Sequence, residues 1–400
     1  MTPDFLQRGT PAAVLAALPE ARAVGGAVRD FLAGKPIHDV DMAVPLPPDA
    51  VAQRLRAAGL KVFETGLQHG TVTAVLEREP VEVTSLRRDV VTDGRHAEVA
   101  WTLDWREDAA RRDFTINAMS MGRDGVLHDD FGGREDLAAG RVRFVGEPRE
   151  RLAEDYLRAL RFFRFWARYG RGAPDAAAVA AIRDAVPGLA RLSVERVWME
   201  IKRLLQAPDP TDALRLMGDT GVLGAVLPWV LPLDLEPLGR LVARQAPSDV
   251  ILRLAALLPA EADHVTLGQQ LKLSGAEVLR LAHVMDQSAM LRPGAGEGQV
   301  LIWQALSRFG TPPDAHLPLW LADARDGQDR SAERAAMPGT PPVFPLHGRD
   351  ALTMGVQPGP QIGVLLAEVE AWWLQKTHTQ ASRQQCLSKL AELVNRNPAA

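Results

Sequence analysis

Residues 25–30, with the sequence GGAVRD, and residues 39–41, DVD, decide the fold of the first third of the chain. The first stretch predicts a short strand over residues 21–26 that runs into Gly25 and Gly26, and then a short helix over residues 27–34. Backbone N–H groups at such a turn face an anion, and the helix dipole strengthens the attraction. The pattern predicts a phosphate-binding turn over which Arg29 closes.

The second stretch places two carboxylates together. Residues 38–44 are predicted as a strand that ends before Pro45, and Asp39 and Asp41 lie two positions apart on it, so both side chains point to one face. Paired carboxylates repel unless a cation lies between them, and hard oxygen ligands select Mg²⁺. The glycine turn and this pair each occur alone on ordinary surfaces, but together they indicate metal-dependent nucleotidyl transfer.

Length and composition limit the class of protein to which the chain can belong. The 400 residues predict about two to four domains. Hydrophobic residues make up 46% of the chain and charged residues 24%, which is typical of a globular protein and not of a disordered one. We expect no membrane span and no signal peptide, and therefore the cytoplasm. Cys386 is the single cysteine, which excludes a disulfide partner within the chain and a multi-cysteine zinc site.

Charge is unevenly distributed along the chain. The 46 basic and 50 acidic residues give a net charge of −4, so no overall positive field attracts nucleic acid. Residues 141–172 are an exception, because they hold nine arginines and four acids. This local basic stripe fits an anionic ligand held in one cleft.

The pattern of elements predicts an α/β head over residues 1–135 and helices after it. Two strands are expected at 70–76 and 81–86, where Val81 and Val83 alternate with Glu82 and Thr84. Residues 87–110 have no steady period and are predicted as a long mobile loop. Helices are expected at 152–169 and 193–206. The remaining chain divides into a neck at 136–206, a body at 207–335 and a tail at 336–400.

A third motif, RRDFTINA at residues 111–118, makes the resemblance to a known protein family specific. With GGAVRD, DVD and EDYLR at 154–158, it occurs in order and at the spacing of a known family. The chain resembles class II CCA-adding tRNA nucleotidyltransferases of the bacterial kind over about residues 20–210. Residues 131–143 and 191–200 match as well, and Asp130 departs from the family in a turn where proline is usual.

The resemblance implies a fold and an activity. The expected fold class is α+β, a polymerase-beta-like nucleotidyltransferase head with a small mixed sheet, followed by an all-α neck, body and tail. The expected activity is template-independent, Mg²⁺-dependent addition of C, C and A to the 3′ end of tRNA, using CTP and ATP and releasing pyrophosphate. Body and tail would hold the acceptor arm of the tRNA.

The resemblance also assigns nucleotide-binding residues. Arg111, Arg112 and Asp113 would hold the sugar and triphosphate, and Asn117 would support them; the alternative is a surface ion-pair cluster. The glycine turn with Gly25, Gly26, Arg29 and Asp30 belongs to the same site. Glu82 stays open: it activates the primer hydroxyl, lies in the outer metal shell, or is an exposed glutamate on a strand.

Base selection follows from the chemistry of two side chains. If Asp155 and Arg158 lie one helical turn apart, the carboxylate accepts from an exocyclic amine while the guanidinium donates to a bare ring nitrogen. Cytosine and adenine offer that pair, whereas uracil and guanine present the reverse. Arg161 and Arg164 continue the same row toward the phosphates. The alternative is a solvated helix face, which we favour only for Arg168.

Other functions remain open. A bacterial poly(A) polymerase shares the head motifs, and a relative can add only CC or only A. The resemblance ties the predicted 87–110 loop to the switch from C to A, which argues against CC-only addition. A non-catalytic RNA-binding protein is disfavoured because Asp39 and Asp41 are both present. His-Asp pairs occur only at residues 38–39 and 128–129, so no C-terminal phosphohydrolase is expected.

Overall fold

The computed structural model describes residues 2–66, 70–92, 97–291, 316–335, 343–376 and 381–396. The chain divides into two compact units, Met1–Leu231 (unit 1) and Pro232–Ala400 (unit 2). Across the described residues, no helix combines the length and apolar character needed to cross a membrane. The finer division into head, neck, body and tail stays a prediction.

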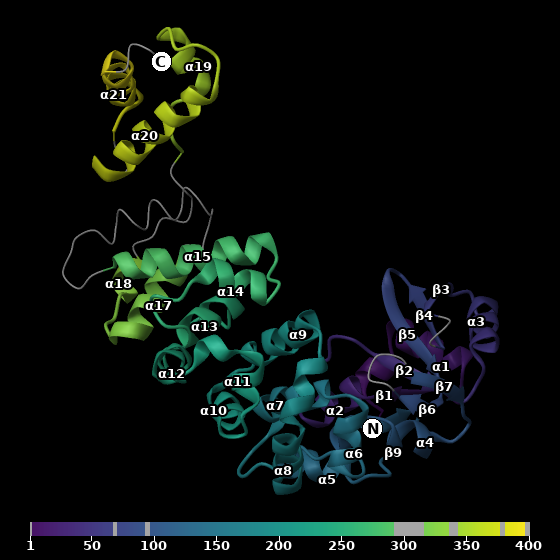
Figure 1. Ribbon diagram of the computed structural model, residues 1–400. Helices are drawn as coiled ribbons and strands as arrows, with labels where there is room; N and C mark the ends of the chain where they lie inside the picture. The colour runs from purple at the N-terminus through teal and green to yellow at the C-terminus, as the bar shows by residue number, and fades with distance from the viewer. Residues whose placement is uncertain are drawn as a thin grey trace. The chain divides into compact units, whose positions relative to one another are not determined.

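A seven-stranded mixed sheet lies in the first part of unit 1 (Figure 1). Its strand order is β3-β4-β5-β2-β1-β8-β9, and neighbours are antiparallel except for the parallel pair β2 and β5. The strands are β1 (Arg22–Val24), β2 (Asp41–Val44), β3 (Lys61–Gly66), β4 (Thr71–Leu76), β5 (Glu79–Ser85), β8 (Ser120–Gly122) and β9 (Leu127–His128). This mixed sheet with helices confirms the expected fold class of the head.

The predicted strands β4 and β5 are confirmed, and their alternation gives the sheet two different faces. Val81 and Val83 are buried, and Glu82 is exposed on the other face. Helices α1 (Gly9–Ala17) and α3 (Pro48–Ala57) pack on β4 and β5 and supply the apolar side of this core. The face that carries Glu82 is the polar one.

The predicted strand over residues 38–44 is shorter than expected. β2 begins at Asp41, so Asp39 precedes it. Its antiparallel neighbour β1 reaches only to Val24, which pairs with Asp41, because the chain turns away at Gly25. Asp39 therefore has no strand partner on that side, and the prediction that a strand aligns both carboxylates is wrong.

The prediction of a long loop over residues 87–110 is also wrong. β6 (Arg87–Thr92) and β7 (Ala97–Trp101) pair antiparallel as a two-stranded sheet, and α4 (Trp105–Ala110) follows. Backbone pairing does not require steady hydrophobic alternation, and the Asp104 side chain caps α4 by accepting from the N–H of Arg106. Residues 93–96, the centre of the expected loop, lie outside the described residues.

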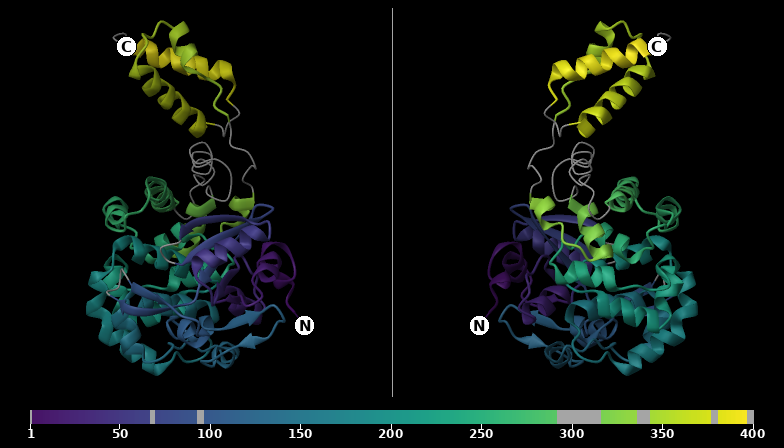
Figure 2. Two further views of the ribbon diagram at one scale, coloured as in Figure 1. Left: turned by 90° about the vertical axis from the view of Figure 1, so that its right-hand side faces the viewer. Right: turned by 90° about the vertical axis from the view of Figure 1, so that its left-hand side faces the viewer.

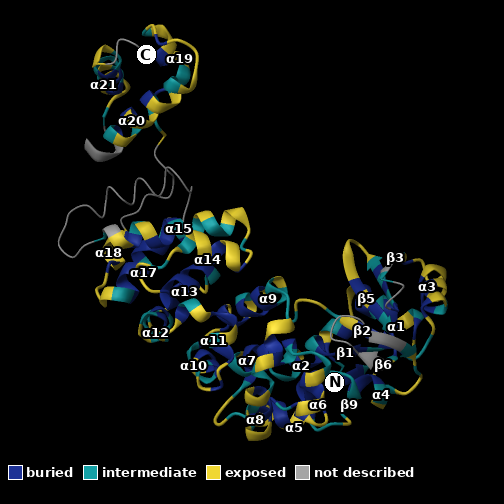
Figure 3. Cartoon of the chain, viewed as in Figure 1, coloured by how far each residue is buried: buried dark blue, intermediate teal, exposed yellow. Residues whose placement is uncertain are grey.

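Helices make up the rest of unit 1, and they carry both buried and exposed residues (Figure 3). The prediction of a single helix over residues 152–169 is wrong, because the helix is interrupted at Asp155. The backbone of Asp155 is extended, with φ −154° and ψ 107°, and its carboxylate accepts from the Leu157 N–H at 3.0 Å. The helices are α2 (Gly26–Leu32) in the head and then α5 (Gly133–Ala139), α6 (Pro148–Glu154), α7 (Leu157–Tyr169), α8 (Ala176–Ala185), α9 (Val194–Leu205), α10 (Thr211–Asp219) and α11 (Val222–Val226).

An aromatic core joins α7 to the segment that follows α4. Phe114 and Phe162 are fully buried, and Phe114 lies 4.9 Å from Phe144 and 5.3 Å from Phe165, measured between ring centres. Such contacts add to the free energy gained by burying the rings. Because Asp113 and Arg161 directly precede two of these rings, the same packing brings their charged side chains together.

The part of unit 2 that the structure describes is helical, as expected. Its last part consists of α19 (Gly348–Thr353), α20 (Pro360–Lys376) and α21 (Arg383–Arg396) (Figure 2). Cys386, Leu390 and Trp373 are buried in the core of these helices. The described helices are α12 (Glu236–Ala243), α13 (Val250–Leu257), α14 (His264–Gln270), α15 (Gly275–Met290), α17 (Leu317–Asp326), α18 (Ser331–Ala335), α19 (Gly348–Thr353), α20 (Pro360–Lys376) and α21 (Arg383–Arg396).

Candidate active site

Two carboxylates lie side by side at one end of the parallel strand pair, and a third lies nearby. The register of β2 and β5 places Asp41 directly beside Glu82. In a parallel pair, aligned residues point to the same face, so both carboxylates share the polar face of the sheet. Asp39, two residues earlier, still lies near enough to act on the charge of Asp41.

The charge of Asp41 is disfavoured in the folded chain. Partial burial and the neighbouring carboxylates of Glu82 and Asp39 raise the pKa of Asp41, and the Arg112 guanidinium only partly opposes them. A cation held between these oxygens would relieve the repulsion. Among the described residues, no group of three or more His, Cys, Asp or Glu side chains forms a ready metal site. The arrangement fits an ion such as Mg²⁺ that takes one or two carboxylates and completes its shell with substrate oxygens.

The glycine turn stands next to these carboxylates in the sheet. Gly25 follows β1 and adopts φ +64° and ψ −118°, a conformation that side chains rarely tolerate. A Cβ at Gly25 would also lie 3.0 Å from Nη1 of Arg112. Glycine is therefore required here by the backbone and by the close approach of an arginine, while Gly26 begins α2.

Arg111 and Arg112 are held by a residue that sequence reasoning missed. Asp108 is buried in α4 and accepts from Nε of Arg111 at 2.9 Å and from Nη2 of Arg112 at 3.2 Å. Burial opposes ionisation of Asp108, but the two guanidinium groups outweigh it and lower its pKa. The carboxylate thus fixes both arginines while each keeps further N–H groups for other partners.

A chain of polar contacts connects the glycine-turn helix to α7. Arg29 donates to Oδ1 of Asn117 at 2.6 Å, and the Asn117 amide donates to Asp113 at 2.9 Å. Asp113 also accepts from Nε of Arg161 at 2.7 Å. Burial opposes ionisation of Asp113, but Arg161 and Asn117 hold its pKa below the usual range. Asp30 pairs with Nε of Arg29 at 2.9 Å.

The network ends on α9 at a second residue that was missed. Glu200 is buried and accepts from Nε of Arg164 at 2.6 Å, and its other oxygen lies 3.9 Å from Nη1 of Arg161. Arg161 and Arg164 are therefore neutralised by protein carboxylates in this structure. Residues 191–200 had matched the family motif, so a sequence signal for Glu200 existed.

The expected pairing of Asp155 with Arg158 on one helix is not found. Asp155 lies in the break between α6 and α7, and its Oδ2 accepts from Nη2 of Arg196 at 2.6 Å. Arg158 pairs with Glu154 and donates to the carbonyl of Arg151 at 2.8 Å. The cause is the interruption at Asp155, which turns its carboxylate toward α9 and leaves Glu154, at the end of α6, as the carboxylate that pairs with Arg158.

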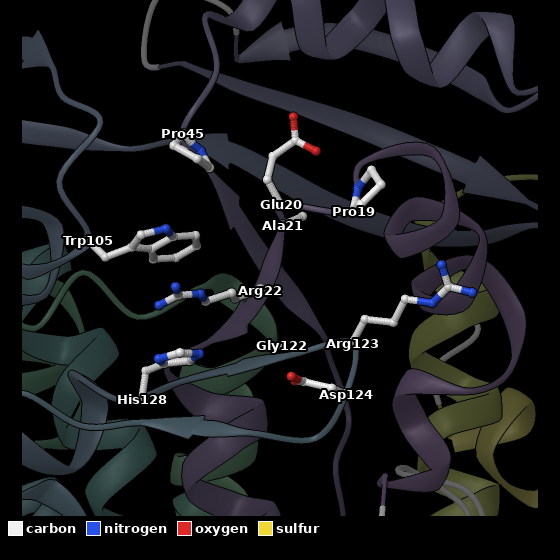
Figure 4. A pocket seen from close by; sticks show the side chains of 10 residues that line it. All are labelled: Pro19, Glu20, Ala21, Arg22, Pro45, Trp105, Gly122, Arg123, Asp124 and His128. Atoms are coloured by element: carbon white, nitrogen blue, oxygen red, sulfur yellow. The ribbon is translucent and has the colours of Figure 1, made fainter.

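A cavity of about 570 Å³ lies elsewhere on the head (Figure 4). The Arg22 guanidinium lies 4.1 Å from the centre of the Trp105 ring, and His128 also lines the cavity. Among the described residues that line it, none is a site residue expected from the sequence. The cavity is therefore separate from the carboxylate site.

A small mixed sheet, carboxylates beside a glycine turn and a row of fixed arginines together define a nucleotidyltransferase of the polymerase-beta-like class. Two family profiles match the chain. "Poly A polymerase head domain" matches residues 21–143, and "Probable RNA and SrmB- binding site of polymerase A" matches residues 174–232.

Comparison with similar proteins identifies the family within this class. The mitochondrial CCA tRNA nucleotidyltransferase 1 of Danio rerio is 37% identical over 384 residues, which is 93% of this chain and 87% of that protein. The CCA-adding enzyme of Levilactobacillus brevis is 30% identical over 366 residues, 88% of each chain. The Bacillus stearothermophilus CCA-adding enzyme in complex with CTP has a similar structure, with a TM-score of 0.76 and 28% identity over 100% of this chain and 99% of that one. The chain belongs to the family of CCA-adding tRNA nucleotidyltransferases.

Proposed function

We propose that this chain adds C, C and A in turn to the 3′ end of tRNA, without a template, from CTP and ATP. The observation that carries the proposal is the match to a CCA tRNA nucleotidyltransferase over 93% of the chain, which includes head and helical regions alike. The carboxylates beside the glycine turn support the same chemistry.

We assign Asp39 and Asp41 as the residues that hold Mg²⁺, and the raised pKa of Asp41 supports this assignment. The ion, when bound, neutralises charge on the triphosphate and lowers the pKa of the primer hydroxyl. Glu82 lies beside Asp41 on the same face, which favours a role next to the reacting groups over that of a remote surface glutamate.

The remaining side chains act by positioning. The 3′ hydroxyl of the tRNA attacks the α-phosphate in line, and pyrophosphate leaves. Arg29, Arg111 and Arg112 would contact the phosphates, since Asp108 fixes the last two and Arg112 lies close to Gly25 of the glycine turn. Asp113 and Asn117 would hold Arg29 and Arg161 in register. Arg161 and Arg164 reach a phosphate only by giving up part of their contact with Asp113 and Glu200.

Base selection is assigned to the break between α6 and α7. Asp155 offers an acceptor toward the exocyclic amine of cytosine or adenine, and Arg158 offers donors toward the ring nitrogen. Arg196 and Glu154 hold these two side chains, so we extend the proposed base-reading group to both. Wrong bases would leave a buried polar group unpaired, at a cost of about 1–3 kcal/mol.

The test is extension of tRNA transcripts that end before the CCA, after C and after CC. Each nucleoside triphosphate is supplied singly and in mixtures, and the Asp41→Asn variant serves as the inactive control. We expect CTP alone to add two residues, CTP with ATP to add three and then stop, and UTP and GTP to add none. Long A tails on any RNA would identify a poly(A) polymerase instead.

Products that stop at CC, or that require a CC end, would show a partial activity of the same family. The cellular compartment is a separate question, because the animal relatives are mitochondrial forms by name. We propose the cytoplasm for this chain, and cell fractionation with a tagged copy tests it.

A further inference from the structure

A cavity of about 420 Å³ in unit 1 is lined by cations from three helical segments. Lys35 follows α2, Arg134 belongs to α5, and Arg168 and Arg171 stand at the end of α7. The other lining residues are apolar or aromatic: Leu32, Ala33, Leu137, Ala138, Tyr169 and Gly170. We call this the cationic cavity, and among the described residues that line it there is no carboxylate.

Two of the four cations are held in place by helix ends. Lys35 Nζ donates to the carbonyl of Arg168 at 2.7 Å, and Arg171 Nη2 donates to the carbonyl of Ala138 at 2.8 Å. These carbonyls lie at the C-terminal ends of α7 and α5, where the helix dipole favours positive charge. The fold thus fixes the positions of the Lys35 ammonium and the Arg171 guanidinium.

The other two cations are available to a ligand. Arg134 and Arg168 are exposed, and neither forms an ion pair with a carboxylate of the described residues. Burial and the charge of Arg168 lower the pKa of Lys35, and Asp30 only partly opposes them. Positive charge is in excess here, although the whole chain carries a net charge of −4.

The lining favours a phosphate group over a nucleobase. Arg29 and Lys35 lie 4.5 and 4.4 Å from the centre of the Tyr169 ring, so the one aromatic ring of the cavity is already in contact with two cations. Its hydroxyl donates to Asp30. A base would find neither a free aromatic surface nor side-chain acceptors for its amines, whereas a phosphodiester needs only donors and positive charge.

We propose that the cationic cavity binds a backbone phosphate of the tRNA, at a place distinct from the nucleotide site. This inference rests on the proposed function, which supplies a polyanion as the substrate. It extends the surface that holds the tRNA to residues of the predicted head and neck, beyond the predicted body and tail to which the sequence analysis assigned that role.

The test replaces the two exposed arginines with Arg134→Gln and Arg168→Gln in the full-length chain. The dissociation constant for tRNA is measured over a range of salt concentrations, together with KM for CTP. Each lost phosphate contact lowers the magnitude of the slope of log K against log salt by about 0.7–0.9, so loss of the single proposed phosphate contact should lower it by about that amount. KM for CTP should not change.

The matched control is the double variant Arg149→Gln and Arg183→Gln, which removes the same charge from exposed positions on α6 and α8. Its slope should stay close to that of the parent. Thermal unfolding checks that both variants fold. Equal slopes for the cavity variant and the control variant would overturn the proposal.

Inorganic phosphate at constant ionic strength supplies the second arm. If phosphate raises the unfolding temperature of the parent but not of the cavity variant, while tRNA binding is equal in both, the cavity takes a free anion and the RNA contact is wrong. Failure of the proposed function is a different outcome, because then the parent chain itself would not extend tRNA.

Discussion

Asp41 shows how a single side chain can be costly to the folded protein and still be required by its chemistry. Its carboxylate lies beside Glu82 and near Asp39, and the raised pKa records the repulsion. Asp108 and Asp113 behave in the opposite way, since nearby arginines lower their pKa values. The candidate site therefore contains two kinds of carboxylate. Asp108 and Asp113 are neutralised by the arginines that they position, whereas the charge of Asp41 is not fully compensated by the protein.

The first prediction concerns Asp41. A carboxyl whose folded pKa lies above its unfolded value loses its contribution to stability as pH rises through that folded pKa, so at neutral pH the charge destabilises the fold. We expect Asp41→Asn to raise the unfolding temperature in EDTA and to lose the stabilisation that Mg²⁺ gives the parent. Addition of C and of A should both fall at least about 100-fold.

Differential scanning calorimetry with EDTA and with Mg²⁺ measures the effect on stability. Asp130→Asn, at an exposed aspartate of the same unit, is the control and should keep the response to Mg²⁺. An Asp41→Asn variant that melts below the parent in EDTA, or that keeps the Mg²⁺ response, would contradict the assignment.

The second prediction separates base reading from helix capping at Asp155. Asp155→Ala removes both functions, whereas Asp155→Asn keeps an oxygen for the Leu157 N–H and adds an amide NH₂ group that can donate to a carbonyl of uracil or guanine. Both variants should incorporate UTP or GTP relative to CTP about tenfold more readily than the parent.

Single-nucleotide incorporation with each triphosphate measures this ratio. Arg196→Gln, which removes the partner of Asp155, tests whether that arginine positions the carboxylate. If Asp155→Asn slows CTP and UTP by the same factor, the carboxylate only stabilises the start of α7.

At the scale of elements, α7 is attached to the head by charge as well as by aromatic packing, and α9 packs on α7 and pairs with its arginines. The polar chain from Arg29 through Asn117, Asp113 and Arg161 reaches Glu200 on α9. Phe114 and Phe162, which directly follow Asp113 and Arg161, are both fully buried. Motion of α7 would therefore change the position of the phosphate-binding arginines.

The third prediction is that Glu200→Ala destabilises unit 1. Its removal leaves the buried guanidinium of Arg164 without its carboxylate, which typically costs about 3–5 kcal/mol. Arg203→Gln removes the half-exposed partner of the same glutamate and should cost no more than about 1 kcal/mol. Urea unfolding compares the two, and similar losses would show that the Glu200 pair contributes little.

The fourth prediction concerns the β6–β7 pair. Deletion of residues 93–96 should leave addition of CC intact and impair addition of A, because cytosine and adenine differ in size and the base-reading group must shift between them. Primers that end before C, after C and after CC measure the three steps separately. An equal loss of all three would indicate that this segment only supports the fold.

At the scale of the whole molecule, tRNA must bind to a chain whose overall charge opposes it. The fifth prediction is that residues 1–231, expressed alone, unfold cooperatively and are stabilised by CTP, but show a KM for tRNA at least about tenfold higher than the full chain, because separate contacts to one RNA reinforce each other. A truncated chain with an unchanged KM for tRNA would exclude unit 2 from RNA binding.

Several structural features that depend on local sequence patterns were predicted correctly. The glycine turn, β4, β5 and the helical character of the later chain followed from turn residues and periodicity. The parallel pairing of Asp41 with Glu82 did not, because it joins strands that are far apart in the chain. The partners of Asp155 and Arg161 were missed for the same reason, since they lie 41 and 48 residues away.

The single cysteine provides a way to observe the C-terminal helices during catalysis. Cys386 is fully buried among α19, α20 and α21, and burial raises the pKa of its thiol. A thiol reagent can reach it only when this part of the chain opens, so the labelling rate reports the free energy of that local opening. Because the chain has no other cysteine, the natural protein carries its own reporter, and protection of the thiol by tRNA would show directly whether these helices tighten when RNA binds.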